Sequence, residues 1–205
     1  MDLTTLEAVR TQLGISSTAD DALLSLYVSQ ASRAIETHCG RRFSGVVGTL
    51  HYDLLSTQVG GRVRGRVLYF STDVLKIDAL YNGSTLLLET DYRLLPVDNA
   101  FLYSTYWARH AVELLPSSGQ SWQVKDNGDP QGAIRVVGTF GYCLASDRPP
   151  DITLAATKLA AWLYQNRDNS GAAVQMADGS VSMPAELPQF ALKVLSRYVR
   201  VEAYF

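Results

Sequence analysis

The stretch PPDITLAATKLAAWLYQNRDNS, residues 149–170, decides the fold of this chain. Its paired prolines suit the start of a helix, and Asp151 follows in the first turn, where a carboxylate meets the positive end of the helix dipole. The helix predicted from there is apolar on nearly every side, yet it is too short to cross a membrane. Isolated helices of this length are marginal in water, so its flanks must be covered, by other parts of the protein or by a neighbouring copy of it. Few polar side chains interrupt the apolar run: Thr153, Thr157, Lys158 and Gln165.

The composition sets broad limits on the class of protein. With 205 residues the chain is long enough to bury a proper core as one or two domains. The net charge of -2 argues against a protein devoted to nucleic-acid binding, which is normally basic. The N-terminus, MDLTTLEAVR, carries an acid where a signal peptide carries positive charge. We therefore expect a soluble, cytosolic protein that does not act at a membrane.

Residues 1–44 have the pattern of two helices. Thr4 followed by Glu7 is a capping box, which predicts a short helix that ends at Gly14. A longer helix is predicted to open near Asp21 and to end at Gly40. The apolar residues of this second helix fall on one face that needs a partner: Leu23, Leu26, Tyr27, Ala31, Ala34 and Ile35.

From residue 45 to residue 147 the apolar period changes to two, which predicts an antiparallel β module of about five to seven strands. The segment TLHYDLL, residues 49–55, places alternate apolar residues on one face: Leu50, Tyr52 and Leu54. Asn82-Gly83 is the favoured pair for a type I′ hairpin turn. The strand before this turn has four residues facing one way: Leu75, Ile77, Ala79 and Tyr81. A later strand does the same in AIRVVGTFGY, with Ile134, Val136, Phe140 and Tyr142.

The last third of the chain returns to the helical period. Residues 148–167 hold the apolar helix, and residues 168–186 form a linker rich in Gly, Ser, Ala and Asp that we expect to be mobile or ordered by a partner. A last helix is predicted in residues 187–205, with Pro188 near its first position. The N-terminal and C-terminal helices most economically bury one another, so the predicted fold is α+β: a helical bundle with an inserted antiparallel β module.

Recognisable catalytic and cofactor-binding motifs are absent from the sequence. VGGRVRG, residues 59–65, lacks the spacing of a phosphate-binding loop, and no GxSxG, HExxH or CxxC occurs. We expect Cys39 and Cys143 to be reduced, buried thiols. The three histidines, His38, His51 and His110, are scattered and fit ordinary surface positions better than a metal site or a triad. The sequence thus predicts no catalytic, metal or cofactor site.

Three local features carry competing interpretations. DNGDP, residues 126–130, fits a tight turn better than a calcium loop, because Val137 occupies the twelfth position, where a Glu is required. The basic loop RVRGR could contact a DNA backbone through Arg62, Arg64 and Arg66, or it could be a solvated loop. An aromatic cluster could stack on a ligand, or could serve packing alone. That cluster comprises Tyr103, Tyr106, Trp107 and Arg109.

Taken in order, these segments resemble the head-to-tail adaptor, or connector, proteins of tailed bacteriophages. DLTTLEAVRTQLGI and DDALLSLYVSQASRAIETHCGRRF, residues 2–15 and 20–43, resemble the opening pair of helices in that family. VLKIDALYNGSTLLLETDYRLLP and IRVVGTFGY, residues 74–96 and 134–142, resemble the insertion of its longer members. The two C-terminal helical segments, residues 149–168 and 187–200, resemble its closing helices.

The resemblance implies a structural virion protein without catalytic residues or cofactors. It implies a homo-oligomeric ring, usually of twelve copies, in the neck at the head-tail interface, assembled in the host cytoplasm. The portal protein and a stopper or tail completion protein would bind its two faces, and genomic DNA would pass through the ring. No membrane would be involved.

The expected contacts follow from this resemblance and from the residue types. Trp162 and Tyr164 on the apolar helix are candidates for the contact between subunits. Arg and aromatic side chains dominate protein interfaces, so the C-terminal region is the candidate for portal docking, with Arg197, Tyr198, Arg200, Tyr204 and Phe205. The alternative is a nucleic-acid-binding virion or regulatory module that uses the loop of residues 62–66. An enzyme with a site assembled from scattered residues remains the third possibility.

Overall fold

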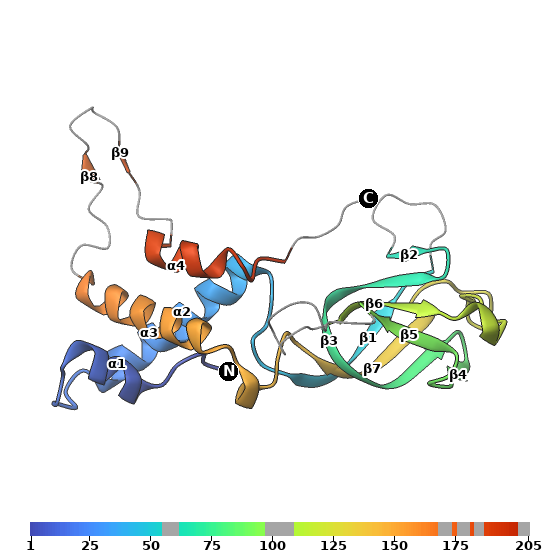
Figure 1. Ribbon diagram of the computed structural model, residues 1–205, viewed down its shortest axis with the longest axis horizontal. Helices are drawn as coiled ribbons and strands as arrows, with labels where there is room; N and C mark the ends of the chain where they lie inside the picture. Colours follow the sequence, from blue (N-terminus) through green and yellow to red (C-terminus); the bar gives the residue numbers. More distant parts are fainter. Residues whose placement is uncertain (55–61, 97–108, 168–173, 176–180, 183–186, 201–205) are drawn as a thin grey trace. The chain divides into compact units, whose positions relative to one another are not determined.

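The computed structural model describes residues 1–54, 62–96, 109–167, 174–175, 181–182 and 187–200. The chain divides into two compact units (Figure 1). The helical unit contains residues 1–41 and 148–205, and the β unit contains residues 42–147. Within the described ranges, no helix has the length and apolar character needed to cross a membrane. The structure therefore confirms the predicted α+β fold, in which an antiparallel sheet interrupts a set of packed helices.

The apolar helix lies at the centre of the helical unit. This helix, α3 (Pro150–Gln165), packs against α1 (Leu6–Leu13), α2 (Asp21–Cys39) and α4 (Gln189–Leu195). Figure 1 shows α1 and α4 on opposite sides of it. Contact with three helices explains why α3 is apolar on nearly every side, and its many small residues let those helices approach closely. Its buried residues are Ile152, Ala155, Ala156, Thr157, Leu159, Ala160 and Ala161.

Local capping signals set the ends of the first two helices. Gly14 and Gly40 follow α1 and α2 with φ values of 68° and 60°, in the left-handed region that glycine adopts without strain. The predicted N-terminal cap is wrong by one residue, because the hydroxyl of Thr5 accepts the hydrogen bond from the amide of Ala8. Thr4 is buried instead, and its hydroxyl lies 2.6 Å from that of Thr157 on α3.

The last helix is shorter than the sequence predicts. α4 ends at Leu195, and Phe190, which was expected in its buried stripe, is 40% exposed. The chain beyond α4 is held to the bundle in a non-helical conformation, since the amide of Arg200 donates to the carbonyl of Cys39 at 2.8 Å. Tertiary contacts thus replace helical hydrogen bonds in this segment. Between α3 and α4, β8 (Val174–Gln175) and β9 (Val181–Ser182) pair as an antiparallel ribbon, and the rest of the predicted linker lies outside the described residues.

The β unit is built on one antiparallel sheet of seven strands. The strand order is β1-β7-β3-β6-β5, and the short β2 and β4 also pair with β3. The strands are β1 (Val46–Tyr52), β2 (Val63–Arg64), β3 (Val67–Asn82), β4 (Thr85–Leu87), β5 (Tyr92–Leu95), β6 (Arg109–Leu114) and β7 (Ile134–Phe140). Two 3₁₀ turns complete the unit, at Pro116–Ser118 and Ala145–Asp147. The core of the sheet includes Tyr52, Leu68, Phe70, Leu80, Val112, Leu114, Ile134 and Val136.

The long strand β3 is irregular, and this changes which residues it buries. Its pairing with β7 shifts register twice, between Val74 and Lys76 and between Ile77 and Ala79. Each shift moves the buried side to the next residue, so Leu80 is fully buried where Ala79 and Tyr81 were expected. The predicted inward face of β3 is therefore wrong beyond Ile77. The predicted face of β7 is confirmed, as burial alternates from Ile134 to Phe140.

The predicted hairpin forms, but its turn is displaced. Asn82 pairs with Thr85, so the central residues are Gly83 and Ser84. Gly83 has a φ of 61°, whereas Ser84 has no positive φ, which excludes the predicted type I′ turn. Asn82 is buried instead, and its side chain donates to the carbonyl of Ser121 and accepts from the amide of Gln123. This residue joins the hairpin to the following loop.

Candidate functional site

The predicted portal-docking residues fall into different environments. Arg197 is exposed, while Tyr198 and Arg200 are half-buried. The hydroxyl of Tyr198 donates to the carboxylate of Asp151, at 2.8 Å from each oxygen. Tyr198 therefore joins the C-terminal segment to the start of α3. Two further members of the predicted set, Tyr204 and Phe205, lie outside the described residues.

The predicted subunit-contact residues on α3 are both half-buried in the helical unit. The hydroxyl of Tyr164 donates to Asp20 at 2.5 Å, and this hydrogen bond raises the pKa of the Tyr164 hydroxyl. The ring of Tyr164 also meets the ring of Tyr27 edge-on, with 6.4 Å between centroids. Tyr164 thus contributes to packing within one copy. Trp162 lies one turn before Asn166, whose side chain donates to the Trp162 carbonyl.

The basic loop has a structural role in the β unit. Arg62 donates to the carbonyl of Phe70 at 3.1 Å. Arg66 donates to the carbonyls of Leu114 and Leu115, at 2.8 Å for the first. Two of the three guanidiniums proposed for DNA contact therefore bind the backbone of their own unit. This arrangement favours the solvated structural loop over a surface that offers all three arginines to phosphate, while Arg64 keeps an exposed side chain.

The cysteines and histidines lie in ordinary environments. Cys39 and Cys143 are free and buried, and burial raises the pKa of the Cys39 thiol to about 12. His38, His51 and His110 are exposed on α2, β1 and β6, respectively. Among the residues that the structure describes, no three His, Cys, Asp or Glu side chains gather in a way that could hold a metal ion. The described part of the chain therefore offers no evident metal or thiol chemistry.

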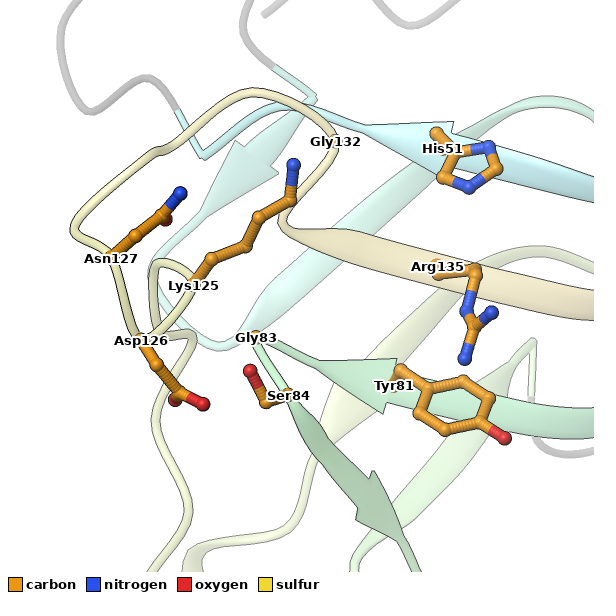
Figure 2. Close-up of a pocket in the computed structure, with 9 residues that line it drawn as sticks. All are labelled: His51, Tyr81, Gly83, Ser84, Lys125, Asp126, Asn127, Gly132 and Arg135. Carbon is orange, nitrogen blue, oxygen red and sulfur yellow. The ribbon is translucent and has the colours of Figure 1, made fainter.

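A hollow of about 560 Å³ lies at one end of the sheet (Figure 2). Figure 2 shows Arg135 reaching over the ring of Tyr81, and the guanidinium carbon lies 3.8 Å from the ring centroid. Lys125 is paired with Asp129 at 3.3 Å. Arg135 and Lys125 therefore have partners within the unit, and the hollow resembles a solvated surface depression more than a catalytic site. Its lining is His51, Tyr81, Gly83, Ser84, Lys125, Asp126, Asn127, Gly132 and Arg135.

The predicted turn at residues 126–130 is confirmed by its hydrogen bonds. The amide of Gly128 donates to the carbonyl of Lys125, and the side chain of Asn127 accepts from the amide of Asp129. The carboxylate of Asp129 accepts from the amide of Gln131, which lowers the pKa of that carboxyl group. Of the predicted aromatic cluster, Arg109 begins β6, and Tyr103, Tyr106 and Trp107 fall outside the described ranges.

Exposed apolar residues are the features that sequence reasoning missed. Val47 on β1 is 75% exposed, and Leu154 on α3 is 50% exposed. Leu26 and Phe190, which were expected to be buried, are exposed on α2 and α4. The strand prediction started at Thr49, so it excluded Val46 and Val47, although both are β-branched residues that suit a strand. The described surface thus offers apolar side chains for contacts with other proteins.

Comparison with known proteins places part of the chain near proteins that function in assemblies. Residues 3–59 match the family model described as "Phage gp6-like head-tail connector protein". No curated protein matches the sequence closely enough to count as a relative.

Solved structures share the fold along nearly the whole chain. One is a chain from the "Neck of native GTA particle computed with C12 symmetry", with 22% identity and a TM-score of 0.56, covering 97% of this chain and 90% of that one. Another comes from the "Neck of empty GTA particle computed with C6 symmetry", with 23% identity, a TM-score of 0.55, and coverage of 97% and 91%. A third comes from the "Virion of native gene transfer agent (GTA) particle", with 22% identity, a TM-score of 0.55, and coverage of 97% and 91%.

The family match lies on α1, α2 and the start of the β unit, the segments in which the sequence already resembled the opening helices of adaptor proteins. The match to the phage gp6-like head-tail connector family, whose members are structural proteins and not enzymes, thus covers residues 3–59, and the similarity in fold to the GTA neck proteins extends over 97% of the chain.

Proposed function

We propose that this protein is an adaptor of the virion neck, which forms a ring of twelve copies between the portal and a stopper or tail completion protein. The observation that carries the proposal is the match of residues 3–59 to the connector family. The likeness of fold over 97% of the chain to proteins of a C12 neck supports the ring and its copy number. The ring surrounds the channel through which genomic DNA passes.

A closed ring makes a specific physical demand on each copy. Each subunit contacts the next through two different surfaces, and the rotation between neighbours closes the ring. Both surfaces must offer side chains that lose contact with water on assembly. The helical unit carries exposed apolar side chains on three of its helices, at Leu26, Leu154 and Phe190. We assign the contact between subunits to this unit, with Trp162 and the ring of Tyr164 at its border.

Docking to the portal is assigned to the C-terminal segment. Arg197 is exposed, and the residues that follow Arg200 are rich in aromatic side chains, which with Arg dominate binding energy at interfaces. Tyr198 has a supporting role in this proposal. By binding Asp151 it fixes the direction in which the C-terminal segment leaves the bundle.

The alternative of a nucleic-acid-binding module is not favoured. Arg62 and Arg66 already donate to carbonyls of the β unit, and the net charge of the chain is -2. DNA in the channel therefore passes the protein without a dedicated binding loop. Weak, strongly salt-dependent retention of DNA by the isolated protein is the expected result, because such contacts release counterions.

Electron microscopy of the purified protein mixed with its portal tests the proposal. We expect a ring stacked coaxially on the portal, with extra density only at the end that faces the tail. A protein that stays monomeric in the mixture, or that binds the side of the portal at random positions, would contradict it. A portal incubated with a variant truncated after Pro188 is the control, because that variant lacks the proposed docking segment.

A further inference from the structure

The two edges of the main sheet are protected to different degrees. One edge is β5, a strand of four residues that Pro96 follows, and its Arg93 is paired with Glu113 at 2.7 Å. Shortness, proline and charge are the usual means by which proteins block an edge. The other edge is β1, which has seven residues. Its register with β7 runs without a shift from Val46↔Phe140 to Tyr52↔Ile134.

The edge of β1 carries none of these protections. VVGTLHY contains no proline, lysine or carboxylate, and no bulge twists the strand away. Among the described residues, β1 pairs on one side only, with β7. Its exposed residues include Val47, at 75%, and Val46, at 44%. A regular, uncharged edge of this length is a template for an additional strand.

The helical unit contains a short two-stranded ribbon, formed by β8 and β9. In the described part of the helical unit, β8 and β9 pair only with each other, with Val174 opposite Ser182 and Gln175 opposite Val181. An isolated two-stranded ribbon is marginal in water, and three or more strands give independent stability. Adding it to an existing sheet edge supplies both the missing hydrogen bonds and the missing strands.

The charges of the two elements are compatible. The segment from residue 168 to residue 186 contains acidic side chains and no lysine or arginine. The β1 edge has no carboxylate of its own, and the exposed His51 is the register partner of the exposed Arg135 on β7. Arg135 is positively charged, so the approach of the acidic segment to this edge is electrostatically favourable.

We propose that the β8–β9 ribbon of one copy adds to the free edge of β1 in the neighbouring copy. This inference rests on the proposed ring, and it names one of the contacts that hold the ring together. The ribbon and the edge are different surfaces, so the contact is head-to-tail, which is the type that a closed ring needs. Backbone hydrogen bonds then supply part of the subunit contact in addition to apolar packing.

Disulfide trapping between two variants, each with one added cysteine, tests the pairing directly. One protein carries Thr49→Cys on β1 and the other Val181→Cys on β9, and both are oxidised together on the portal. Val47→Cys on β1 and Val174→Cys on β8, used in place of the first two variants, test other registers of the ribbon against the edge. The native cysteines are buried, so their background reaction is low. We expect covalent dimers in the mixture for at least one register and none from either protein alone.

Each other result of the trapping experiment overturns the inference. Dimers from the Thr49→Cys protein alone would mean that two β1 edges pair with each other. In a third protein that carries both Thr49→Cys and Val181→Cys, an internal disulfide with no covalent oligomer would mean that the ribbon covers the edge of its own copy. A ring on the portal without any disulfide would remove this contact and leave the proposed function intact. Absence of a ring would instead contradict the proposed function itself.

A charge on the edge provides a second test with a matched control. Val47→Lys should weaken assembly about tenfold, equivalent to roughly 1.4 kcal/mol, because lysine blocks strand addition. Leu86→Lys on β4, where the wild-type side chain is 52% exposed, should change assembly less than about twofold. Equal assembly of both variants would overturn the inference. Hydrogen exchange can be measured on the wild-type protein, so no substitution can disturb the folding. The inference fails if the backbone amides of β1 exchange as fast in the assembled protein as in the free protein.

Discussion

Removing one hydroxyl group at Tyr198 separates a role in folding from a role in docking. Tyr198→Phe keeps the aromatic side chain and removes the hydrogen bond to the Asp151 carboxylate, whose oxygens both lie 2.8 Å from the Tyr198 hydroxyl. The Tyr198 hydroxyl has a single proton, so its two contacts with the Asp151 oxygens are counted as one hydrogen bond in the energy below. Hydrogen bonds to charged groups contribute about 1.5–3 kcal/mol, and partial exposure of this pair places the expected loss near the lower end, at about 1.5 kcal/mol. The change should therefore destabilise the free protein.

Thermal unfolding followed by circular dichroism measures this loss. In a chain of this size, 1 kcal/mol lowers the melting temperature by about 2–4 °C, so the expected shift is roughly 3–6 °C. Tyr27→Phe is the matched control, because Tyr27 packs edge-on against Tyr164 and its hydroxyl has no hydrogen-bond partner among the described residues. It should shift the melting temperature by less than about 1 °C.

The comparison of stability with docking decides between the two roles. If Tyr198 fixes the C-terminal segment, the variant loses stability and still binds the portal at low temperature. Unchanged stability together with lost binding would show that the hydroxyl contacts the portal directly, and the assigned role would be refuted.

Three substitutions and one measurement on the native protein test other parts of the structure. Gly138→Ala should cost about 3 kcal/mol in denaturant unfolding, because a Cβ there would lie 2.1 Å from the carbonyl oxygen of Lys76, whereas Gly48→Ala, with 3.9 Å of clearance, should be nearly neutral. Arg66→Met should destabilise the β unit by about 2 kcal/mol without changing DNA retention, and the reverse result would restore the DNA-binding interpretation. Trp162→Glu should prevent ring assembly, seen by sedimentation, because it places a charge in an apolar contact, while Gln165→Glu on the exposed side should assemble normally. The thiol of native Cys39, with its pKa raised to about 12, should resist alkylation near neutral pH. The same thiol ionises at about pH 8.5 in the unfolded chain, so the free energy of unfolding should fall as the pH rises from that value toward the native pKa.

Signals that act within a few residues could be predicted well from the sequence. Gly14 and Gly40 end their helices because the left-handed conformation at a helix end is a local requirement. The alternation of β7 was also readable, since its register with β1 is regular. Thr4 and Thr5 could not be separated, because both are good capping residues and the choice depends on the contact of Thr4 with Thr157 on another helix.

Features that depend on distant partners were the ones missed. The register shifts in β3 arise from its pairing with β7, where Gly138 allows the close approach of the Lys76 backbone. The position of Asn82 inside the structure depends on Ser121 and Gln123, about forty residues along the chain. The roles of Arg62 and Arg66 were hidden for the same reason, as a basic loop in the sequence does not reveal which carbonyls it will bind.

The apolar circumference of α3 has a simpler explanation than the sequence suggested. Contacts with α1, α2 and α4 in the same copy cover most of it. This helix therefore gives no separate support to the proposed ring. The support comes from the family match, the shared fold, and the exposed apolar residues and free strand edge of the described surface.

The proposed ring can be tested by a reconstruction of the neck of complete particles, calculated without imposed symmetry and with this protein tagged. We expect one closed ring of twelve tagged copies, coaxial with the portal and on its tail side. Particles whose neck lacks the tag, or in which the tag marks single copies outside the axis, would contradict it.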